Sequence, residues 1–425
     1  MSKKENNIKV AFDTLGCKLN QAETEALTDK FVKSGYIVVS SQDDFDIYVL
    51  NTCTVTHVAD RKARHLLRMA HRRNPQAVLV AVGCYAEHST KDLLKIDGVK
   101  LVLGNAEKMK LPQILTGLNA LSFTKGSGFS ADFLSNRRTR SFIAVQEGCN
   151  NFCSYCIVPY VRGREKSVPP EQIVREIKEK VASGFKEIVL TGTEIGAYNY
   201  GGLNLEGLID IILKETPVLR LRISSLQPQE ITPDLINLWE NTRLCPHFHL
   251  SLQSGSDTVL KRMKRRYTTS DYLDAVNLIR SKIDGVAITT DIIVGFPCET
   301  DAEFTESYDF CQEVGFSRIH IFSYSKRRGT AASIMPNQVS PQIMKGRSDL
   351  MLKLAEETSC SFYKGFIEKE IEVLWEQAAD GIWTGYSGNY IKAYTTSNKD
   401  LTNVMSRFVV QRIYEGGVWG EITEQ

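Results

Sequence analysis

The sequence has neither of the apolar segments that direct a chain into a membrane or out of the cell. Residues 1–7 are polar and are not followed by the apolar core of a signal peptide, so we expect no secretory signal. No apolar run approaches the roughly 18 residues that a membrane-spanning helix needs. Ten cysteines among 425 residues are too few for a disulfide scaffold. We therefore expect a cytoplasmic protein without a membrane partner, whose cysteines serve another purpose.

A strong net charge is also absent, but the positive charges are unevenly distributed. The net charge is +2, and the contents of 42% hydrophobic and 24% charged residues are those of an ordinary globular protein. At ~150 residues for each domain, the chain has room for about three domains. Basic residues gather at 61–73, 137–140, 162–164, 261–266 and 326–328. One such run is usually a solvated surface, whereas five favour a polyanionic partner, because neutralising phosphates provides much of the affinity for nucleic acids.

Three of the cysteines are spaced C-x3-C-x2-C. Cys149, Cys153 and Cys156 follow a strand-like run at 141–146, and no fourth Cys or His follows closely. Thiolates are soft ligands suited to zinc, copper(I) and iron–sulfur clusters. Because a structural zinc site normally has four protein ligands, three thiolates indicate a metal site with one position open. A zinc site with a distant fourth ligand, or three buried thiols without metal, are the alternatives.

These residues resemble the cysteine motif of the radical S-adenosylmethionine superfamily. The resemblance implies that Cys149, Cys153 and Cys156 hold a [4Fe–4S] cluster, with Tyr155 as the aromatic residue of the motif. It implies that the fourth iron is chelated by S-adenosylmethionine, which an electron cleaves to a 5′-deoxyadenosyl radical. In such enzymes the cofactor carries the difficult chemistry and the protein orients it.

The first third of the chain alternates between strand-like and helix-like segments. Short apolar runs predict strands at 8–12, 46–50, 77–82 and 100–103, and helical periodicity predicts helices at 21–33, 55–73, 87–94 and 107–118. Such alternation is typical of a parallel sheet with helices on both faces.

Three further cysteines follow strands of this predicted sheet. Cys17 comes after the first strand, Cys53 after the strand at 46–50, and Cys84 after the strand at 77–82. The carboxyl ends of parallel strands lie along one edge, where ligands bind. We therefore expect the three thiols to converge on a second metal site. The alternative is three unrelated buried thiols, since free cysteine packs as a small hydrophobic residue.

The middle of the chain continues the alternation with longer helices. Strands are predicted at 142–146, 187–190, 220–223, 248–252, 288–294 and 318–322, and helices at 169–183, 205–214, 233–240, 272–281, 302–314 and about 342–366. Six such units indicate a TIM-like barrel that stops short of eight and stays open on one side. Cys149 then follows the first strand, at the end of the barrel where chemistry usually takes place.

Polar residues follow two of these strands. Gly192 and Glu194 come after the second strand; the glycine lets a ligand approach the backbone, and the carboxylate can pair with an ammonium. The resemblance to the superfamily implies that both contact the methionyl amino group, and that Ser251 and Gln253 contact the ribose and carboxylate. The alternative for Ser251 and Gln253 is ordinary loop and capping chemistry. Cys245, Cys298, Cys311 and Cys360 have no motif spacing, so we interpret them as packing residues.

The last segment changes to short strands separated by glycine-containing turns. Strands are predicted at 370–376, 381–386, 390–394, 407–413 and 418–422, which indicates a small β-barrel. This segment resembles the TRAM domain, a nucleic-acid-binding module. Trp383, Tyr386, Tyr390 and Tyr394 are either stacking surfaces for unpaired bases or core residues of the barrel.

The whole pattern resembles the methylthiotransferases. It rests on 14–23 (TLGCKLNQAE), Asn51-Thr52-Cys53 and Gly83-Cys84-Tyr85-Ala86 together with the central motif. The resemblance implies that Cys17, Cys53 and Cys84 hold an auxiliary [4Fe–4S] cluster that delivers sulfur. It also implies domains at 1–120, 139–367 and 368–425, and we read the Gly/Ser-rich and Arg-rich stretch at 121–138 as a linker.

The run TLGCKLN looks most like the branch of this family that acts on N6-threonylcarbamoyladenosine. The implied activity is methylthiolation of C2 of this adenosine beside the anticodon of tRNA, with S-adenosylmethionine as both methyl donor and radical source. The implied partners are the tRNA anticodon stem-loop and an electron donor of the flavodoxin or ferredoxin type. The alternatives are isopentenyladenosine in tRNA or a ribosomal-protein aspartate as substrate, or a zinc-containing RNA-binding protein with no enzymatic activity.

Overall fold

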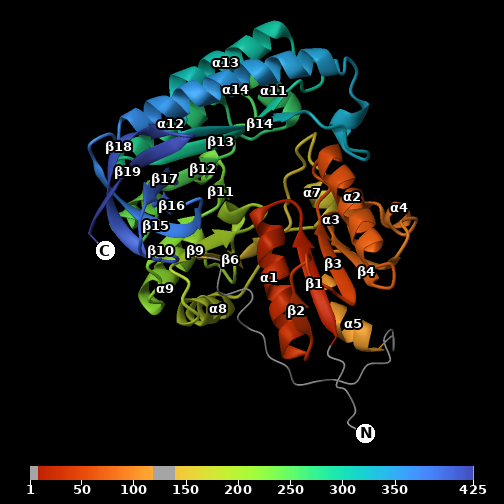
Figure 1. Ribbon diagram of the computed structural model, residues 1–425. Coiled ribbons are helices and arrows are strands. Elements are labelled where there is room, and N and C mark those ends of the chain that lie inside the picture. Colours follow the sequence, from red (N-terminus) through yellow and green to blue (C-terminus); the bar gives the residue numbers. More distant parts are fainter. Residues whose placement is uncertain (1–7, 118–138, 425) are drawn as a thin grey trace.

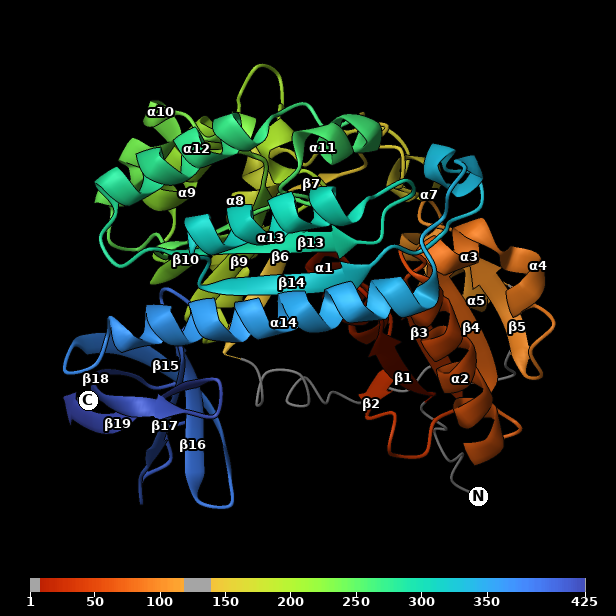
Figure 2. The ribbon, with the colours of Figure 1, turned by 90° about the horizontal axis from the view of Figure 1, so that it is seen from above.

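The computed structural model describes residues 8–117 and 139–424, which form three parts. An N-terminal α/β domain and a central α/β barrel lie side by side, and a small β-barrel packs below the central barrel (Figures 1 and 2). The linker predicted at 121–138 lies entirely outside the described residues. No helix in the described ranges is long and apolar enough to cross a membrane.

The N-terminal domain is a parallel five-stranded sheet in the order β2-β1-β3-β4-β5. The strands are β1 (Lys9–Thr14), β2 (Ile37–Val39), β3 (Ile47–Thr52), β4 (Val78–Gly83) and β5 (Val99–Leu103). Helices α1 (Lys18–Lys33) and α5 (Leu111–Gly117) bury Phe31 and Leu115 against one face, and α2 (His57–Arg73) buries Leu67 against the other. The predicted parallel sheet with helices on both faces is therefore confirmed.

Two predicted helices of this domain are interrupted, and one strand was missed. The segment 87–94 contains α3 (Cys84–His88) and α4 (Thr90–Leu93), because Ser89 leaves the helical region at φ −144° and ψ 48°. The segment 107–118 begins as a 3-10 turn, Lys108–Lys110, before α5. Strand β2 has only three residues, too few for a periodic pattern.

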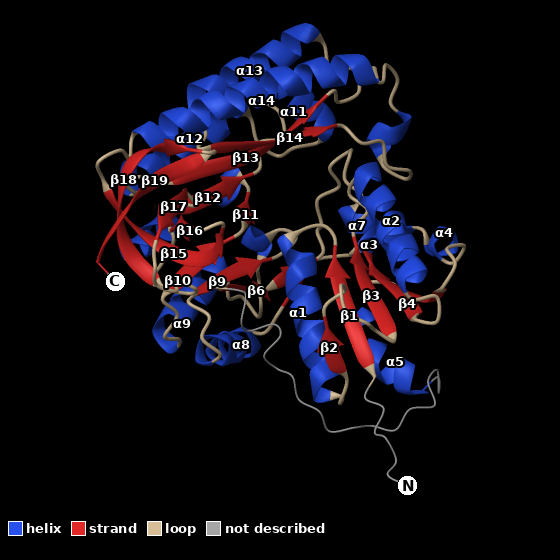
Figure 3. Cartoon of the chain, in the orientation of Figure 1, coloured by secondary structure: helices blue, strands red, loops and turns tan. Residues whose placement is uncertain are grey.

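The central domain has a three-stranded and a four-stranded parallel sheet, which an isolated bridge between Leu221 and Leu244 connects and which together curve into a partial barrel open on one side (Figure 3). The six predicted strands are β6 (Arg140–Ala144), β9 (Glu187–Thr191), β10 (Arg220–Ile223), β12 (His247–Leu250), β13 (Ala287–Val294) and β14 (Arg318–Ser323). Three two-residue strands accompany them: β7 (Gln146–Glu147), β8 (Lys166–Ser167) and β11 (Ser225–Leu226). The pairs are parallel, apart from β7 with β8, so the partial TIM-like barrel is confirmed.

Helices cover the outside of this partial barrel. The predicted ones are α8 (Pro170–Ala182), α9 (Leu205–Glu215), α10 (Pro233–Asn237), α12 (Thr269–Lys282), α13 (Asp301–Val314) and α14 (Pro341–Lys364). Two short helices were missed, α7 (Val158–Val161) and α11 (Asp257–Met263). Each is shorter than the two turns on which a periodic pattern can be recognised.

The N-terminal domain covers the open side of the central barrel and contacts both of its edges (Figure 1). Beside β6, Lys180 forms an ion pair with Asp29 of α1 at 3.0 Å. Beyond β14, the buried Arg327 forms an ion pair with Asp60 of α2 at 2.8 Å. The two domains together therefore enclose the interior that the barrel alone would leave open.

The C-terminal strands form a closed barrel in the order β15-β16-β17-β19-β18. They are β15 (Glu370–Ala379), β16 (Ile382–Ser387), β17 (Lys392–Thr396), β18 (Met405–Tyr414) and β19 (Gly417–Glu424). The core contains Val373, Trp375 and Phe408. Closure leaves no free edge strand in this small sheet.

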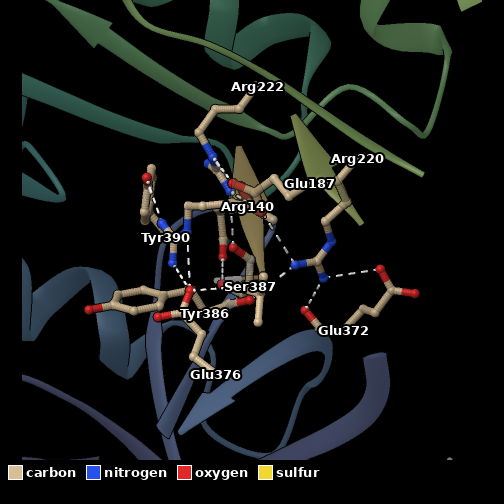
Figure 4. Close-up of polar contacts among 12 residues, drawn as sticks. Arg140, Glu187, Arg220, Arg222, Glu372, Glu376, Tyr386, Ser387 and Tyr390 are labelled. Atoms are coloured by element: carbon tan, nitrogen blue, oxygen red, sulfur yellow. Dashed lines mark hydrogen bonds and ion pairs between the residues drawn. The ribbon is translucent and has the colours of Figure 1, made fainter. Parts of the chain in front are cut away.

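Buried arginines of the central domain join it to the C-terminal barrel (Figure 4). Arg222 is fully buried and donates to Glu187 at 2.8 Å, and also to the carbonyl of Gly388. Arg140 pairs with Glu376 of β15. Burial alone would raise the pKa of Glu187, but the neighbouring guanidinium groups, Arg222 first, lower it to about 2. This carboxylate therefore stays charged and holds the junction together.

All four candidate stacking residues of the C-terminal barrel pack against protein groups: Trp383, Tyr386, Tyr390 and Tyr394. Trp383 and Tyr394 are buried in the barrel. Tyr386 and Tyr390 face the central domain, where Arg140 lies 4.9 Å and 5.4 Å from their ring centroids and Arg222 lies 3.8 Å from that of Tyr390. Their packing against protein, rather than stacking on RNA bases, is the alternative that holds.

We expect Glu187→Ala to destabilise the protein, because it leaves the buried Arg222 guanidinium without its carboxylate. Removing one partner of a buried ion pair costs about 3–5 kcal/mol. Denaturant unfolding followed by tryptophan fluorescence measures the loss in unfolding free energy, since Trp375, Trp383 and Trp419 all lie in the C-terminal barrel.

Asp210→Ala is the matched control, because Asp210 pairs with Lys214 on an exposed turn of α9. We expect this exposed pair to contribute less than about 0.5 kcal/mol. Equal destabilisation by the two substitutions would contradict the role given to Glu187.

Candidate active site between two groups of cysteines

The structure places Cys17, Cys53 and Cys84, the N-terminal cysteine group, at the carboxyl ends of neighbouring strands. Cys17 is the N-cap of α1, Cys53 follows β3 directly, and Cys84 follows β4 as the first residue of α3. A Cβ atom added to Gly16 would lie 2.6 Å from the Cβ atom of Cys53, so the loop before Cys17 packs directly on Cys53. Gly16 also has a backbone φ of +109°, an angle that residues with a side chain rarely adopt.

The surroundings of this group fit metal-bound thiolates. The Cys53 sulfur accepts from the backbone N–H of Val55 at 3.5 Å, and the Cys84 sulfur accepts from Asn105 at 3.6 Å. Burial first, and then the neighbouring Cys17 and Cys84, raise the pKa of Cys53 to about 12. As a free thiol Cys53 would stay protonated, so it becomes a thiolate only beside a bound metal.

Charged residues from two domains surround this group. The buried Arg162 of the central domain forms an ion pair with Glu23 of α1 at 2.7 Å, and Lys108 pairs with the same carboxylate at 2.6 Å. The positive charges of Arg162 and Lys108 oppose the rise that burial causes in the pKa of Cys84. Arg162 thus belongs to this site, and its place in the basic run 162–164 does not indicate a contact with nucleic acid.

The central cysteine group, Cys149, Cys153 and Cys156, lies on the loop between β7 and α7. The Cys156 N–H donates to the carbonyl of Cys153 at 3.0 Å, which folds the C-x2-C segment into a tight turn. Burial first, and then the neighbouring Cys153, raise the pKa of Cys156 to about 12. Like Cys53, Cys156 becomes a thiolate only beside a bound metal.

The two cysteine groups approach one another through α7. Ile157, directly after Cys156, and Val161 pack against Cys84 in one small buried cluster. Asn105 donates to the carbonyl of Val161 at 2.7 Å as well as to Cys84. The loop that carries one group therefore covers the other.

Of the residues expected to contact S-adenosylmethionine, Glu194 lies beside the central group. Its carboxylate accepts from the Cys149 thiol at 2.9 Å and from the side chains of Asn151 and Gln227, and it is buried. Gly192 precedes it in a turn where an added Cβ would lie 3.0 Å from the carbonyl oxygen of Gln146. A buried carboxylate directed at this loop is suited to binding an ammonium group.

Ser251 and Gln253 lie on the loop after β12 and are connected to the cysteines by Arg265. Arg265 donates to the Cys153 sulfur at 3.4 Å and to the Ser251 carbonyl at 3.5 Å. Gln253 has φ +70° and pairs with β13 through Asp291 and Ile293. Tyr155 is half-buried and packs beside Met263 and Phe296.

Several residues of the site had no signal in the sequence. Arg265 lies in the basic run 261–266, and its contact with Cys153 emerges only in the fold. Gln146 holds the turn after β9, because its Oε1 atom accepts from the N–H groups of Thr193 and Glu194. Its position directly before the cysteine loop is the one hint that the sequence offered. Cys245, Cys298, Cys311 and Cys360 belong to neither group.

Comparisons with known proteins agree with this division. The radical SAM superfamily profile matches residues 143–311, and that of "Uncharacterized protein family UPF0004" matches residues 9–104. Among solved structures, the radical S-adenosylmethionine methyltransferase TsrM from Kitasatospora setae has a TM-score of 0.58 at 14% identity, covering 77% of each chain. At that identity the likeness concerns the fold.

Curated relatives cover nearly the whole chain. The threonylcarbamoyladenosine tRNA methylthiotransferase MtaB of Bacillus subtilis is 35% identical over 96% of this chain and 94% of that protein. The protein of the same name from Aquifex aeolicus is 41% identical over 86% of this chain and 92% of its own. The tRNA-2-methylthio-N(6)-dimethylallyladenosine synthase of Moorella thermoacetica is 34% identical over 85% of this chain and 86% of its own.

We expect the two cysteine groups to hold metal independently. Two four-iron clusters correspond to about eight irons per chain. A variant with alanine at 17, 53 and 84 should keep about four, and so should a variant with alanine at 149, 153 and 156. Iron and sulfide analysis after anaerobic reconstitution measures this. Loss of all iron from either variant would contradict two separate sites.

Proposed function

This chain belongs to the radical S-adenosylmethionine methylthiotransferases, and from that premise we propose that it methylthiolates C2 of N6-threonylcarbamoyladenosine beside the anticodon of tRNA. The observation that carries the proposal is the meeting of two groups of three cysteines at one domain interface. One radical site alone would not need the second group, whereas sulfur insertion needs a place that holds the sulfur.

In this proposal the family's two [4Fe–4S] clusters are divided between the groups. Cys149, Cys153 and Cys156 hold the cluster that binds S-adenosylmethionine, and Cys17, Cys53 and Cys84 hold the auxiliary cluster. When bound, these cofactors supply a 5′-deoxyadenosyl radical and the sulfur that is methylated and transferred. The N–H donors on the sulfurs of Cys53 and Cys84 support the second assignment.

The chain's own residues bind and orient. Glu194 binds the ammonium of S-adenosylmethionine, because its buried carboxylate already lies at Cys149. Gly192, Ser251 and Gln253 contact the rest of the same ligand, and Tyr155 packs behind the loop. Arg265 connects the loop of Ser251 to Cys153, which fixes the ligand's position relative to the cluster.

Arg162 and Lys108 place positive charge beside the N-terminal cysteine group. Three thiolates and a carboxylate in a buried site repel one another unless cations balance them. The same side chains exclude water from the interface of the two domains. We assign them a positioning role, since they act through the thiolates.

Dimethylallyladenosine in tRNA is the second candidate substrate, since relatives with that name are also similar to this chain. Relatives named for threonylcarbamoyladenosine are 35–41% identical to this chain and those named for dimethylallyladenosine 32–37%, two overlapping ranges of which the higher favours the threonylcarbamoyl substrate. Nucleoside analysis of bulk tRNA from a deletion strain tests the choice. Loss of the methylthio form of threonylcarbamoyladenosine alone supports the proposal, and unchanged nucleosides refute it.

We propose that an electron donor of the flavodoxin or ferredoxin type supplies the electron for radical formation. The chemistry requires a single electron at low potential, which clusters and flavins deliver.

We expect Cys17→Ala to keep cleavage of S-adenosylmethionine but to lose methylthiolation, because only the auxiliary cluster is affected. Cys153→Ala should lose both. Release of 5′-deoxyadenosine on reduction measures the first activity and methylthio-nucleoside formation the second. Cys360→Ala on α14 is the matched control and should retain both. Equal loss of cleavage in the first two variants would contradict this division.

The exposed face of α2 is the proposed contact for the tRNA backbone. Arg61, His65, Arg68 and Arg72 are spaced four, three and four residues apart, so they lie along one face of the helix, and all are exposed. By contrast, Arg140, Arg162, Arg265 and Arg327 from the other basic runs are engaged in contacts within the protein. Arg137 and Arg138 lie outside the described residues.

We expect replacement of Arg61, Arg68 and Arg72 by alanine to weaken tRNA binding. If each contacts a phosphate, the slope of log affinity against log salt should fall by about 2–3. Filter binding over a salt series measures both quantities. Alanine at Lys178, Lys214 and Lys282, which are exposed on α8, α9 and α12, changes the charge equally and should leave the slope unchanged. The same slope in both triple variants would exclude α2 as the contact.

A further inference from the structure

A cavity of about 220 Å³ lies within the protein and is lined by residues of all three parts of the chain. Lys18 comes from the first turn of α1, His249, Thr289 and His320 come from strands β12, β13 and β14, and Tyr390 comes from the C-terminal barrel. Since one water occupies about 30 Å³ in the liquid, the cavity has room for a substituent of several heavy atoms.

The cavity begins beside the proposed active site. Lys18 follows Cys17 directly, and consecutive Cα atoms are about 3.8 Å apart, so one wall starts at the N-terminal cysteine group. On the opposite wall, His249 contacts Asp291, whose carbonyl accepts from the N–H of Gln253 at 2.8 Å. A substrate held between the two cysteine groups therefore has this cavity next to it.

The carboxylates around the cavity are already engaged. Asp291 lies 3.3 Å from Nε2 of His249, whose Nδ1 contacts the hydroxyl of Thr289 at 3.0 Å. At the junction with the C-terminal barrel, Glu187 pairs with Arg222 and Glu376 pairs with Arg140. The lining also contains the cations Lys18 and Arg318 and the polar side chains of His247, His320 and Tyr363.

The ammonium group of Lys18 forms no close ion pair: Arg222 and Arg140 lie near enough to repel it, and Glu187 and Asp291 attract it from a greater distance than an ion pair. Among the described residues no carboxylate lies within 4.0 Å of its Nζ atom, and the contact found is with the ring of Tyr390, 5.8 Å away. Arg318, on the same cavity, is also without a carboxylate partner in the described part of the chain. The lining combines aromatic rings with two cations that form no ion pair in the described part of the chain, so the cavity can take a substituent with an anionic end.

The two candidate substrates differ at this point. The threonylcarbamoyl substituent carries a carboxylate, a hydroxyl and a urea, whereas the dimethylallyl substituent is a hydrocarbon. An apolar group in this cavity would remove water from Lys18 without offering it a partner, which is unfavourable. A carboxylate would form a charge-assisted hydrogen bond with it.

We propose that Lys18 binds the carboxylate of the amino-acid substituent on N6 and thereby selects threonylcarbamoyladenosine. The inference rests on the proposed function and assigns its substrate specificity to a named residue. His320 and Arg318 also line the cavity, where they can bind the other polar atoms of the substituent.

A two-by-two comparison tests the proposal. The holoenzyme and its Lys18→Met variant are assayed on an anticodon stem-loop RNA that carries threonylcarbamoyladenosine, and on the same RNA with the threonyl carboxylate converted to its methyl ester. With the wild type, we expect esterification to lower kcat/KM for methylthiolation by about 100-fold, mostly through KM. With Lys18→Met, esterification should change kcat/KM by less than about 3-fold, because the partner of the carboxylate is gone.

A structural defect gives a different result, since it would lower kcat/KM for both RNAs equally and keep their ratio. Equal sensitivity of the wild type and Lys18→Met to esterification would overturn the proposal. Lys18→Arg, which keeps the charge, should remain sensitive to the ester, and Lys18→Gln serves in the same comparison if Lys18→Met does not hold iron. A wild type that methylthiolates a dimethylallyladenosine stem-loop and not this RNA would refute the proposed function itself.

Discussion

The structure depends on a fixed interface between the N-terminal domain and the central barrel. Each carries one cysteine group, so neither can place a sulfur and a radical at the same atom without the other. Arg162, buried and paired with Glu23, and Arg327, buried and paired with Asp60, fix this interface from two sides. A charge buried at a domain interface is costly unless it meets its own partner, so a shifted register would be penalised.

Arginine–carboxylate ion pairs also hold the interface between the central barrel and the C-terminal barrel. Arg222 and Glu187 are both almost inaccessible to solvent, and Arg140 connects to Glu376 beside Tyr386 and Tyr390. These contacts fix the C-terminal barrel beneath the cavity, so Tyr390 can belong both to the junction and to the cavity wall. The small barrel therefore contributes to the shape of the interior, since Tyr390 lines the cavity.

The sequence predicted what local patterns encode. Strand periodicity located all six main strands of the central barrel, and the position of Cys17, Cys53 and Cys84 after strands predicted that they would converge, because parallel strands share a carboxyl edge. Charge patterns were less informative. The basic runs looked alike, yet Arg162, Arg265 and Arg327 contact groups that lie 139, 112 and 267 residues away in sequence. Arg61, Arg68 and Arg72 instead lie on an exposed face of α2. Such partners are set by tertiary packing, which a single sequence does not reveal.

The covering of Cys84 by Ile157 and Val161 has a consequence for how the protein is made. Domains generally fold in order as the chain leaves the ribosome. The first α/β domain can therefore fold while Cys84 is still uncovered, before Ile157 and Val161 have been synthesised. That interval leaves all three thiols of the nascent domain open to iron and sulfide. After the later segments have docked, Cys84 is covered, and Cys17 is the thiol of this group that stays exposed.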